Sequence, residues 1–474
     1  MSHNIAKENK MGTMPEGRLV ISMGVPLMLS NLVQALYNIV DSIFVSRLTT
    51  DELVLDAMGN PVSAGTDAIS ALGLAFPIQI IIFAIGMGTS VGVTSLVSRS
   101  LGEGNRSKAN NTAMHGIILM ALSYLICLFM GIFLAPMLIE GQGAEGRTLL
   151  YGSTYLRIVC CLSIAVYMEI MFERLLQSTG RSALSMIPQI TGAVINMIMD
   201  PILIYGLLGA PKLGVAGAAY ATVFGQSVAT VLGIFLNRKL NHDLHISFRE
   251  FKFDPHIVKG IYAVGAPSIA LQAVGSVMNY AMNSILIDLN AAAVAVFTIY
   301  YKLQSFFFLP VFGLNNAVIP IVAYNFGAKK KSRMMKSIKW ALLYSFLLLF
   351  VGFLAFELIP ATLIRIFDTG DASLIELGVP ALRIIGCHFL LAWFCIIMIG
   401  VFQAVGNGVY SMLCSIFRQL GALIPAAFIL ATLFGLPAVW WSFPIAEGVS
   451  LLMTLLFYRK IDKKVLSQLP DDQS

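Results

Sequence analysis

Long apolar runs, separated by short polar and charged gaps, fill almost the whole chain. A helix needs about 20 apolar residues to cross the hydrocarbon core of a bilayer. The runs are continuous and do not alternate between apolar and polar positions, which excludes a membrane β-barrel. By these rules the sequence predicts twelve spanning helices, at about 19–46, 68–98, 109–138, 148–173, 182–207, 213–237, 260–287, 293–325, 337–358, 376–403, 409–433 and 437–458.

The composition supports the prediction of membrane-spanning helices and excludes several other classes of protein. Hydrophobic residues make up 57% of the 474 residues and charged residues only 12%, with a mean hydropathy of +0.81. A soluble domain averages roughly 25% charged residues, so half that amount cannot cover a water-soluble protein of this size. The composition therefore excludes a soluble enzyme, a disordered protein and a nucleic-acid-binding module. It predicts an all-α integral protein of the cell membrane.

The basic residues are distributed unevenly between the gaps. If the N-terminus lies inside, 23 of the 31 Lys and Arg residues fall in inside segments, four in outside segments and four within spans. Short cytoplasmic loops carry an excess of Lys and Arg in membrane proteins. The split predicts an even number of spans with both termini in the cytoplasm. The polar first 18 residues contain no apolar signal-peptide core, so the first span is expected to be retained.

The two halves of the chain repeat one another. Gly24-Val-Pro26 matches Gly265-Ala-Pro267 at an offset of 241, while Gly102 and Gln177 match Gly327 and Gln403 at offsets of 225 and 226. Matching positions lie six helices apart. Because six is an even number, the second half crosses the membrane in the same direction as the first, as in transporters whose two halves are related by an axis along the membrane normal. Two such six-helix bundles favour an alternating-access transporter over a receptor or a channel subunit.

The repeat gives predicted domain boundaries. They are a cytoplasmic tail at 1–18, an N-lobe of helices 1–6 at 19–240, a cytoplasmic linker at 241–259, a C-lobe of helices 7–12 at 260–460 and a cytoplasmic tail at 461–474.

Two carboxylates within the spans stand out as candidates for ion coupling. Asp41 has Tyr37 one turn before it and Asn38 three residues before it, on one helix face, which makes both candidates for the substrate cavity. Asp200 has Asn196 one turn before it. A charge inside a membrane is costly, so such residues indicate function by default. Amide and carboxylate oxygens suit Na⁺, and the carboxylates suit a proton equally well.

Other intramembrane residues are weaker candidates. Glu169 and Glu173 lie four residues apart, so two negative charges there would repel. Glu447 lies in the middle of the twelfth span and Lys302 deep in the eighth, and both are candidates for the substrate cavity. Lys302 would there neutralise a carboxylate or contact substrate. Pro26 interrupts the hydrogen bonding of the first span and is a candidate hinge.

The chain contains no phosphate-binding G-x-x-x-x-G-K-[ST] motif. Transport by this chain is therefore expected to be driven by an ion gradient, without a resident cofactor.

Several strings resemble motifs of the multidrug and toxic compound extrusion (MATE) family. They are Tyr37-Asn-Ile-Val-Asp-Ser-Ile-Phe-Val, Asn196-Met-Ile-Met-Asp-Pro-Ile-Leu-Ile, Gly214-Val-Ala-Gly-Ala-Ala-Tyr-Ala-Thr, Pro320-Ile-Val-Ala-Tyr-Asn-Phe-Gly and Gln403-Ala-Val-Gly. The resemblance runs from about residue 15 to 460. The Asn196 string is the most specific of these motifs.

The resemblance implies a V-shaped pair of lobes in a monomer that exports lipophilic organic cations in exchange for Na⁺ or H⁺. It also implies that Asp41 and Asp200 line an N-lobe cavity, joined at a cation site by Asn196 and Thr222, and that the first helix bends at Pro26. One branch of the family carries a coupling Asp in helix 10. Helix 10 here, around Cys387 and His388, has none, so the chain resembles the MepA-like branch that couples through the N-lobe.

One alternative function shares this architecture. A lipid-linked oligosaccharide flippase must hold a pyrophosphate, so its cavity should be strongly basic, and the four basic residues within spans leave that reading open. The acidic N-lobe motifs favour cation export. The acidic outside loop at 47–67 departs from the family pattern, and the sequence assigns it no role.

Overall fold

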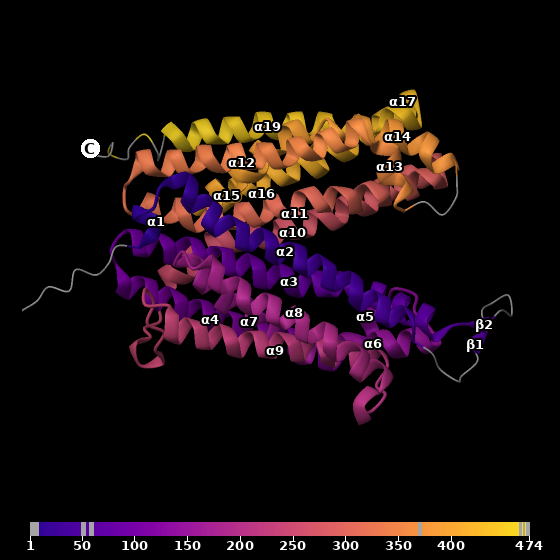
Figure 1. The fold of residues 1–474 in the computed structure, drawn as a ribbon, viewed down its shortest axis with the longest axis horizontal. Helices are drawn as coiled ribbons and strands as arrows, with labels where there is room; N and C mark the ends of the chain where they lie inside the picture. The colour runs from indigo at the N-terminus through magenta and orange to yellow at the C-terminus, as the bar shows by residue number, and fades with distance from the viewer. Residues whose placement is uncertain are drawn as a thin grey trace, which may run out of the picture.

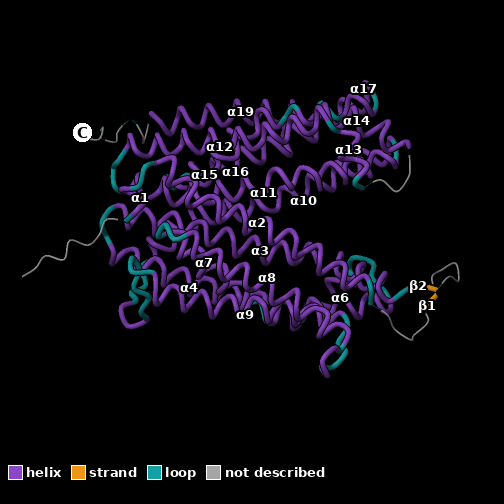
Figure 2. Tube along the Cα trace, in the orientation of Figure 1, coloured by secondary structure: helices purple, strands orange, loops and turns teal. Residues whose placement is uncertain are grey.

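The computed structural model of the chain describes residues 9–48, 54–55, 61–367, 372–463, 467 and 470. Nearly all of these residues are helical, with short connections between helices (Figure 2). The loop at 47–67, singled out by its acidic residues, lies partly outside the described residues. Its described part includes two antiparallel two-residue strands, β1 (Val54–Leu55) and β2 (Pro61–Val62).

The first half of the chain forms a group of helices that we call the N-lobe. Its helices run in both directions along the long axis of the molecule (Figure 1). They are α2 (Glu16–Ser46), α3 (Ala64–Gly102), α4 (Arg106–Phe129), η1 (Met130–Leu134), α5 (Ala135–Glu140), α6 (Gly146–Cys161), α7 (Ile164–Ser178), α8 (Ser182–Tyr205), η2 (Leu207–Gly209) and α9 (Val215–Leu240).

The second half forms the C-lobe, which follows a connection that contains η3 (Phe248–Glu250). Its helices are α10 (Pro255–Leu289), α11 (Ala291–Gly327), α12 (Lys331–Leu358), α13 (Pro360–Arg365), α14 (Ala372–Gly386), α15 (Phe389–Ala404), α16 (Gly408–Ile416), η4 (Phe417–Leu423), α17 (Ile424–Phe434), α18 (Leu436–Val439) and α19 (Ser442–Ile461).

Twelve spans are present when bent pairs are counted as one. Among the described residues, ten helices are long and apolar enough to cross a membrane, and two further spans each consist of two helices with a bend between them. Each of the twelve predicted runs corresponds to one of these spans, which confirms the predicted fold class. Several helices begin earlier than the apolar run, α12 at Lys331 and α10 at Pro255, because polar end turns continue the helix beyond the lipid.

The two bends fall at equivalent positions of the repeat. The α6–α7 pair bends by 48° and the α14–α15 pair by 51°. At the first bend Ser163 Oγ donates to the carbonyl oxygen of Cys160 (2.8 Å), and at the second His388 Nδ1 donates to that of Ile385 (2.6 Å). Ser163 and His388 are 225 residues apart, the same offset as the glycine matches. Each of these side chains thus supplies a hydrogen bond to a carbonyl oxygen near the end of the first helix of its pair.

The lobes lie side by side, close together at the end that carries α1 (Lys10–Thr13) and diverging toward the opposite end (Figure 1). Glycines allow the close approach. A Cβ on Gly102 of α3 would overlap the carbonyl oxygen of Tyr324 on α11, and a Cβ on Gly327 of α11 would overlap that of Arg99 on α3. Gly102 and Gly327 are the repeat-related pair, so each lobe contributes the same contact to the interface. Close helix packing through small residues is typical of membrane proteins.

The N-terminal segment ties the two lobes together at this end. Asn9 Nδ2 donates to the carbonyl oxygen of Thr179 in the N-lobe (2.9 Å). Asn325 Nδ2 of the C-lobe donates to the carbonyl oxygen of Met11 (3.1 Å), and Arg333 donates to that of Met14. The Met11 side chain is fully buried in a core cluster that contains residues of both lobes. Separation of the lobes at this end would break all of these contacts.

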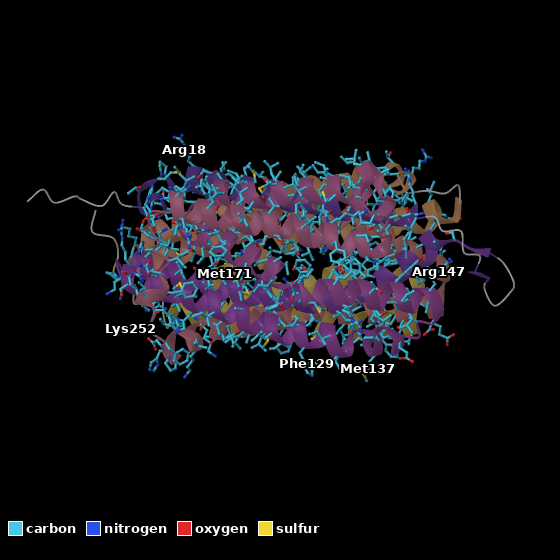
Figure 3. The ribbon with its side chains drawn as sticks, turned by 90° about the horizontal axis from the view of Figure 1, so that it is seen from below. Arg18, Phe129, Met137, Arg147, Met171 and Lys252 are labelled. Carbon is cyan, nitrogen blue, oxygen red and sulfur yellow. The ribbon has the colours of Figure 1, made fainter. Side chains whose placement is uncertain are left out.

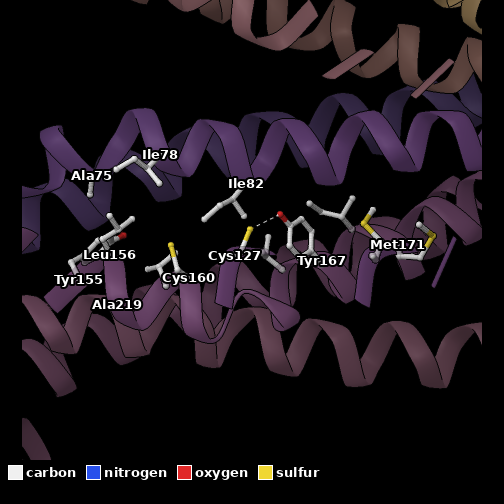
Figure 4. Packing of buried hydrophobic residues seen from close by; sticks show 14 of the residues in the cluster. Ala75, Ile78, Ile82, Cys127, Tyr155, Leu156, Cys160, Tyr167, Met171 and Ala219 are labelled. Carbon is white, nitrogen blue, oxygen red and sulfur yellow. Dashed lines mark hydrogen bonds between the residues drawn. The ribbon is translucent and has the colours of Figure 1, made fainter. Parts of the chain in front are cut away.

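Each lobe also has its own apolar core. In the N-lobe, Tyr167 and Cys127 meet between α4 and α7 with their Oη and Sγ atoms 3.0 Å apart (Figure 4). On the outer sides of the molecule, large apolar side chains such as Phe129 and Met137 point away from the helices (Figure 3). A surface this apolar is compatible with lipid and not with water.

We expect Gly102→Ala to destabilise the protein by about 1–3 kcal/mol, because the new methyl group forces α3 and α11 apart. Gly73→Ala, on the same helix, is the matched control, since a Cβ there meets no atom within 4 Å. Thermal unfolding of the purified variants in detergent measures the difference. Equal melting temperatures for the two variants would show that the glycine contact does not hold the lobes together.

Candidate functional site

A cavity of about 770 Å³ lies on the side of the N-lobe that faces the C-lobe. Its walls come from α2, α3, α6, α7, α8 and α9, and two amide side chains of the C-lobe, Gln272 of α10 and Asn316 of α11, also reach it. Its size is within the range of pockets that hold small organic ligands.

Two carboxyl groups meet at the wall of this cavity. Asp41 of α2 lines it, and Asp200 of α8 lies fully buried beside it, with the two carboxyl groups within hydrogen-bonding reach of one another. One oxygen of each, Oδ1, is buried without a hydrogen-bond partner among the described residues. Two ionised carboxylates this close repel strongly in a buried site. The pair therefore requires a proton or a bound cation.

Asn196 and Thr222 extend this pair. With its amide oriented so that Nδ2 faces the carboxylate, Asn196 donates to Asp200 Oδ2 (3.1 Å) and its Oδ1 lies 3.2 Å from Thr222 Oγ1. Both residues are buried and also line the cavity. The structure thus places all four predicted ion-coupling residues in one cluster. Their oxygens are the hard ligands that suit Na⁺, and the carboxyls suit a proton.

The rest of the lining combines aromatic, apolar and amide groups. Tyr37 and Asn38, the predicted cavity residues of α2, both line it, as do Phe76 and Phe83 of α3. Such a lining suits flat organic molecules that carry a positive charge, because aromatic faces attract cations.

A second acidic region lies farther along the cavity. Glu169 and Glu173, one turn apart on α7, both line it, and Glu173 Oε1 is buried without a hydrogen-bond partner in the described part of the chain. Arg174 is next to them, and its Nη1 donates to Gln177 Oε1 (3.2 Å). The structure thus puts Glu173 in the cavity wall.

Lys302 occupies a separate hollow beside the cavity. This hollow is lined by Lys302 of α11 and by residues of α2 that include Asn38 and Ser42. Asn38 and Ser42 also line the main cavity, so the two spaces share an edge. Lys302 Nζ lies 5.8 Å from the ring centre of Phe367.

Glu447 lies in a different environment from the one predicted. It is buried in α19 of the C-lobe, where Arg418 Nη1 of η4 lies 3.4 Å from its Oε2, and it does not line the cavity. The ion pair explains how a carboxylate is held within this span without an exchangeable cation.

Pro26 does not interrupt α2 in this structure. The helix is continuous from Glu16 to Ser46, with Pro26 inside it. A hinge at this position therefore remains a prediction.

Sequence reasoning missed one polar contact in the cavity wall. Gln79 Nε2 of α3 donates to Tyr155 Oη of α6 (3.1 Å), and both residues line the cavity. Tyr155 had no neighbour in sequence that could have identified it.

Comparison with known families decides the relationship. The MatE family model matches residues 26–202 and again residues 267–446. The chain belongs to the MatE family. The two matched segments agree with the internal repeat, and the predicted resemblance to the MATE family is confirmed.

Curated relatives carry export names. The chain is 27% identical over 439 residues to the multidrug export protein MepA of Staphylococcus haemolyticus, with 92% of each chain covered. It is 26% identical over 442 residues to the multidrug export protein MepA of Staphylococcus aureus strain bovine RF122, with 93% of each covered.

Solved structures share the fold. One is an outward-facing multidrug resistance MATE family transporter of the MOP superfamily, with a TM-score of 0.88 at 24% identity over 98% of this chain and 99% of that one. Another is a MATE transporter in a bent conformation, with a TM-score of 0.85 at 24% identity over 96% of each chain.

We expect Arg418→Met to destabilise the C-lobe by about 3–5 kcal/mol, because it leaves the Glu447 carboxylate buried without its cation. The double variant Arg418→Met/Glu447→Met removes both charges and should recover most of that loss. Thermal unfolding in detergent compares the two. A double variant no more stable than the single one would show that the ion pair is not what this part of the C-lobe depends on.

Proposed function

We propose that this protein is a secondary active exporter of lipophilic organic cations, which it exchanges for H⁺ or Na⁺. The observation that carries the proposal is the Asp41–Asp200 pair, which is buried at the wall of a cavity large enough for a drug-sized molecule. The names of the MepA relatives support multidrug export as the general activity.

The coupling follows from competition for the same negative charge. An antiporter needs the ion and the substrate to favour different states, since a ligand bound equally by both states shifts nothing. A proton or Na⁺ on Asp41 and Asp200 cancels the charge that would hold an organic cation. Ion binding therefore releases the substrate, and loss of the ion restores the negative charge that binds it.

Residue roles follow from position. Asp41, Asn196, Asp200 and Thr222 hold the coupling ion, and Tyr37 and Asn38 contact the substrate. Lys302 borders the same space through Asn38 and Ser42, where it would neutralise a carboxylate or contact the substrate. We leave Glu447 out of the substrate site, because Arg418 binds it away from the cavity.

Pro26 is proposed as the point where α2 bends during transport. Solved MATE transporters include one in a straight and one in a bent conformation, as well as a P26A mutant. The proline removes a backbone hydrogen bond inside α2, and a bend there would move Asp41 relative to Asp200.

The flippase alternative is less well supported by the cavity. A pyrophosphate requires a cluster of cations, whereas the lining includes the carboxylates of Asp41, Glu169 and Glu173 and the guanidinium of Arg174. The acidic groups outnumber the basic one among these lining residues, which favours a cationic substrate.

We propose that the protein works as a monomer in the cell membrane, and the split of basic residues supports an orientation with both termini in the cytoplasm. Single cysteines at residues 4 and 470 and in the 238–259 connection should react with a membrane-impermeant reagent only after the cells are opened. A cysteine in the 47–67 loop should react in intact cells. Labelling of the two termini from opposite sides would contradict the orientation.

We expect Asp41→Asn and Asp200→Asn each to abolish coupled efflux, because a neutral amide takes up no proton and has no negative charge for which Na⁺ and an organic cation could compete. Ethidium efflux from proteoliposomes driven by imposed H⁺ or Na⁺ gradients measures this, with monodispersity checked for every variant. Glu103→Gln is the matched control, a carboxylate on the surface that pairs with Arg99 and Lys108, and it should retain wild-type rates. Wild-type coupled efflux by both Asp variants would overturn the proposal.

A further inference from the structure

The connection between the lobes, residues 241–254, has one side packed on the protein and one side turned outward. Leu244 is buried, and Ile246 and Phe251 pack against the N-lobe core. In contrast, Phe248 is 73% exposed and Phe253 is 71% exposed. Two large aromatic side chains are thus presented by a segment that buries its other apolar residues.

This exposure is not the result of a loose segment. The first turns of α4 hold the backbone of the connection in several places. Asn111 bonds both the N–H and the carbonyl oxygen of Lys252 (3.2 and 2.8 Å), and His115 Nε2 accepts from the Asp254 N–H (3.0 Å). Asn110 Oδ1 accepts from the His245 N–H (2.8 Å). The fold therefore fixes the outward position of the phenylalanines.

The charge of the exposed side is positive. Arg249 and Lys252 are exposed next to the two phenylalanines. Of the acidic residues in the connection, Asp243 pairs with Arg181 (3.0 Å) and the Asp254 side chain caps the start of α10, which leaves Glu250 as the acidic group near the patch. Basic residues interleaved with exposed aromatics are typical of segments that bind an anionic membrane surface.

The position of the connection fits such a surface. It joins the end of α9 to the start of α10 and projects from the outer edge of the N-lobe, away from the C-lobe (Figures 1 and 2). Val231 and Phe235 on the last turns of α9 are also exposed. The lipid-facing side of α9 therefore extends to the start of the connection. The connection therefore lies at the level where the membrane interface meets the bundle.

We propose that Phe248 and Phe253 insert into the membrane interface while Arg249 and Lys252 bind the head groups of anionic lipids. The connection thereby anchors the outer face of the N-lobe to the bilayer. The proposal concerns lipid contact alone and is independent of the transported substrate.

The opposite end of α9 offers a matched control. The loop between α8 and α9 projects from the same outer edge at the other end of the lobe (Figure 1). Leu208 there is 91% exposed and adopts a positive φ of 58°. The η2 sequence Leu207-Leu208-Gly209 carries no charge. It should contact lipid regardless of head-group charge.

The test uses tryptophan as a depth probe in the full-length protein. Phe248→Trp and Leu208→Trp are reconstituted separately into vesicles of phosphatidylcholine, with or without one third phosphatidylglycerol, in which all the lipid is brominated so that the quencher concentration is constant. The wild type corrects for the four native tryptophans. The added fluorescence should be quenched in both variants. Quenching at residue 248 should fall roughly two-fold when phosphatidylglycerol is omitted. The charge substitutions Arg249→Gln/Lys252→Gln, made in the Phe248→Trp background, should have the same effect. The Leu208→Trp signal should be unchanged by lipid charge.

Two results would overturn the proposal. If Phe248→Trp is unquenched while Leu208→Trp is quenched, the connection faces water or a protein partner. If quenching at residue 248 is unaffected by phosphatidylglycerol and by the charge substitutions, the contact is apolar alone and the anionic head group has no part in it. Neither result depends on efflux, so a failure of the lipid-contact proposal is distinguishable from a failure of the proposed export function.

Discussion

The burial of the Asp41 and Asp200 carboxyl groups side by side is the constraint on which the rest of the structure depends. Each charge is expensive inside a membrane protein, and two charges in contact are more so. Asn196 compensates one oxygen of Asp200, but an oxygen of each aspartate remains without a partner among the described residues. The fold therefore maintains a site whose negative charge has to be balanced by an exchangeable proton or cation.

The C-lobe shows the opposite solution to the same problem. There Glu447 is balanced by a cation from its own lobe, Arg418. A tethered cation cannot leave, so this carboxylate is held in one state of charge. The contrast explains why the acidic pair of the N-lobe is the better candidate for coupling, although both lobes derive from one repeat. It also agrees with the absence of an Asp from the sequence around Cys387 and His388.

The sequence predicted the twelve spans and the repeat because lipid imposes a long apolar run on each helix. The sequence also predicted that Asn196 and Asp200 lie together, since residues four apart share a helix face. That Asp41 meets Asp200 followed from the family resemblance and not from spacing, because the two are on different helices. The Arg418–Glu447 and Gln79–Tyr155 contacts were not predictable, since each joins two different spans, and spacing along one helix says nothing about contacts between helices. The bends at Ser163 and His388 were also missed. The first contains no proline or glycine, and Gly386 at the second was not distinguished from the many glycines inside straight helices.

The central claim is that ion and organic cation compete for one buried carboxyl pair. Equilibrium binding of tetraphenylphosphonium to the purified protein, with simultaneous measurement of protons or Na⁺ released, tests this most directly. The account predicts that binding of the organic cation releases the coupling ion, that a rising concentration of that ion weakens its affinity, and that Asp41→Asn and Asp200→Asn remove the release. Tight binding of tetraphenylphosphonium that releases no ion and is insensitive to both pH and Na⁺ would contradict it.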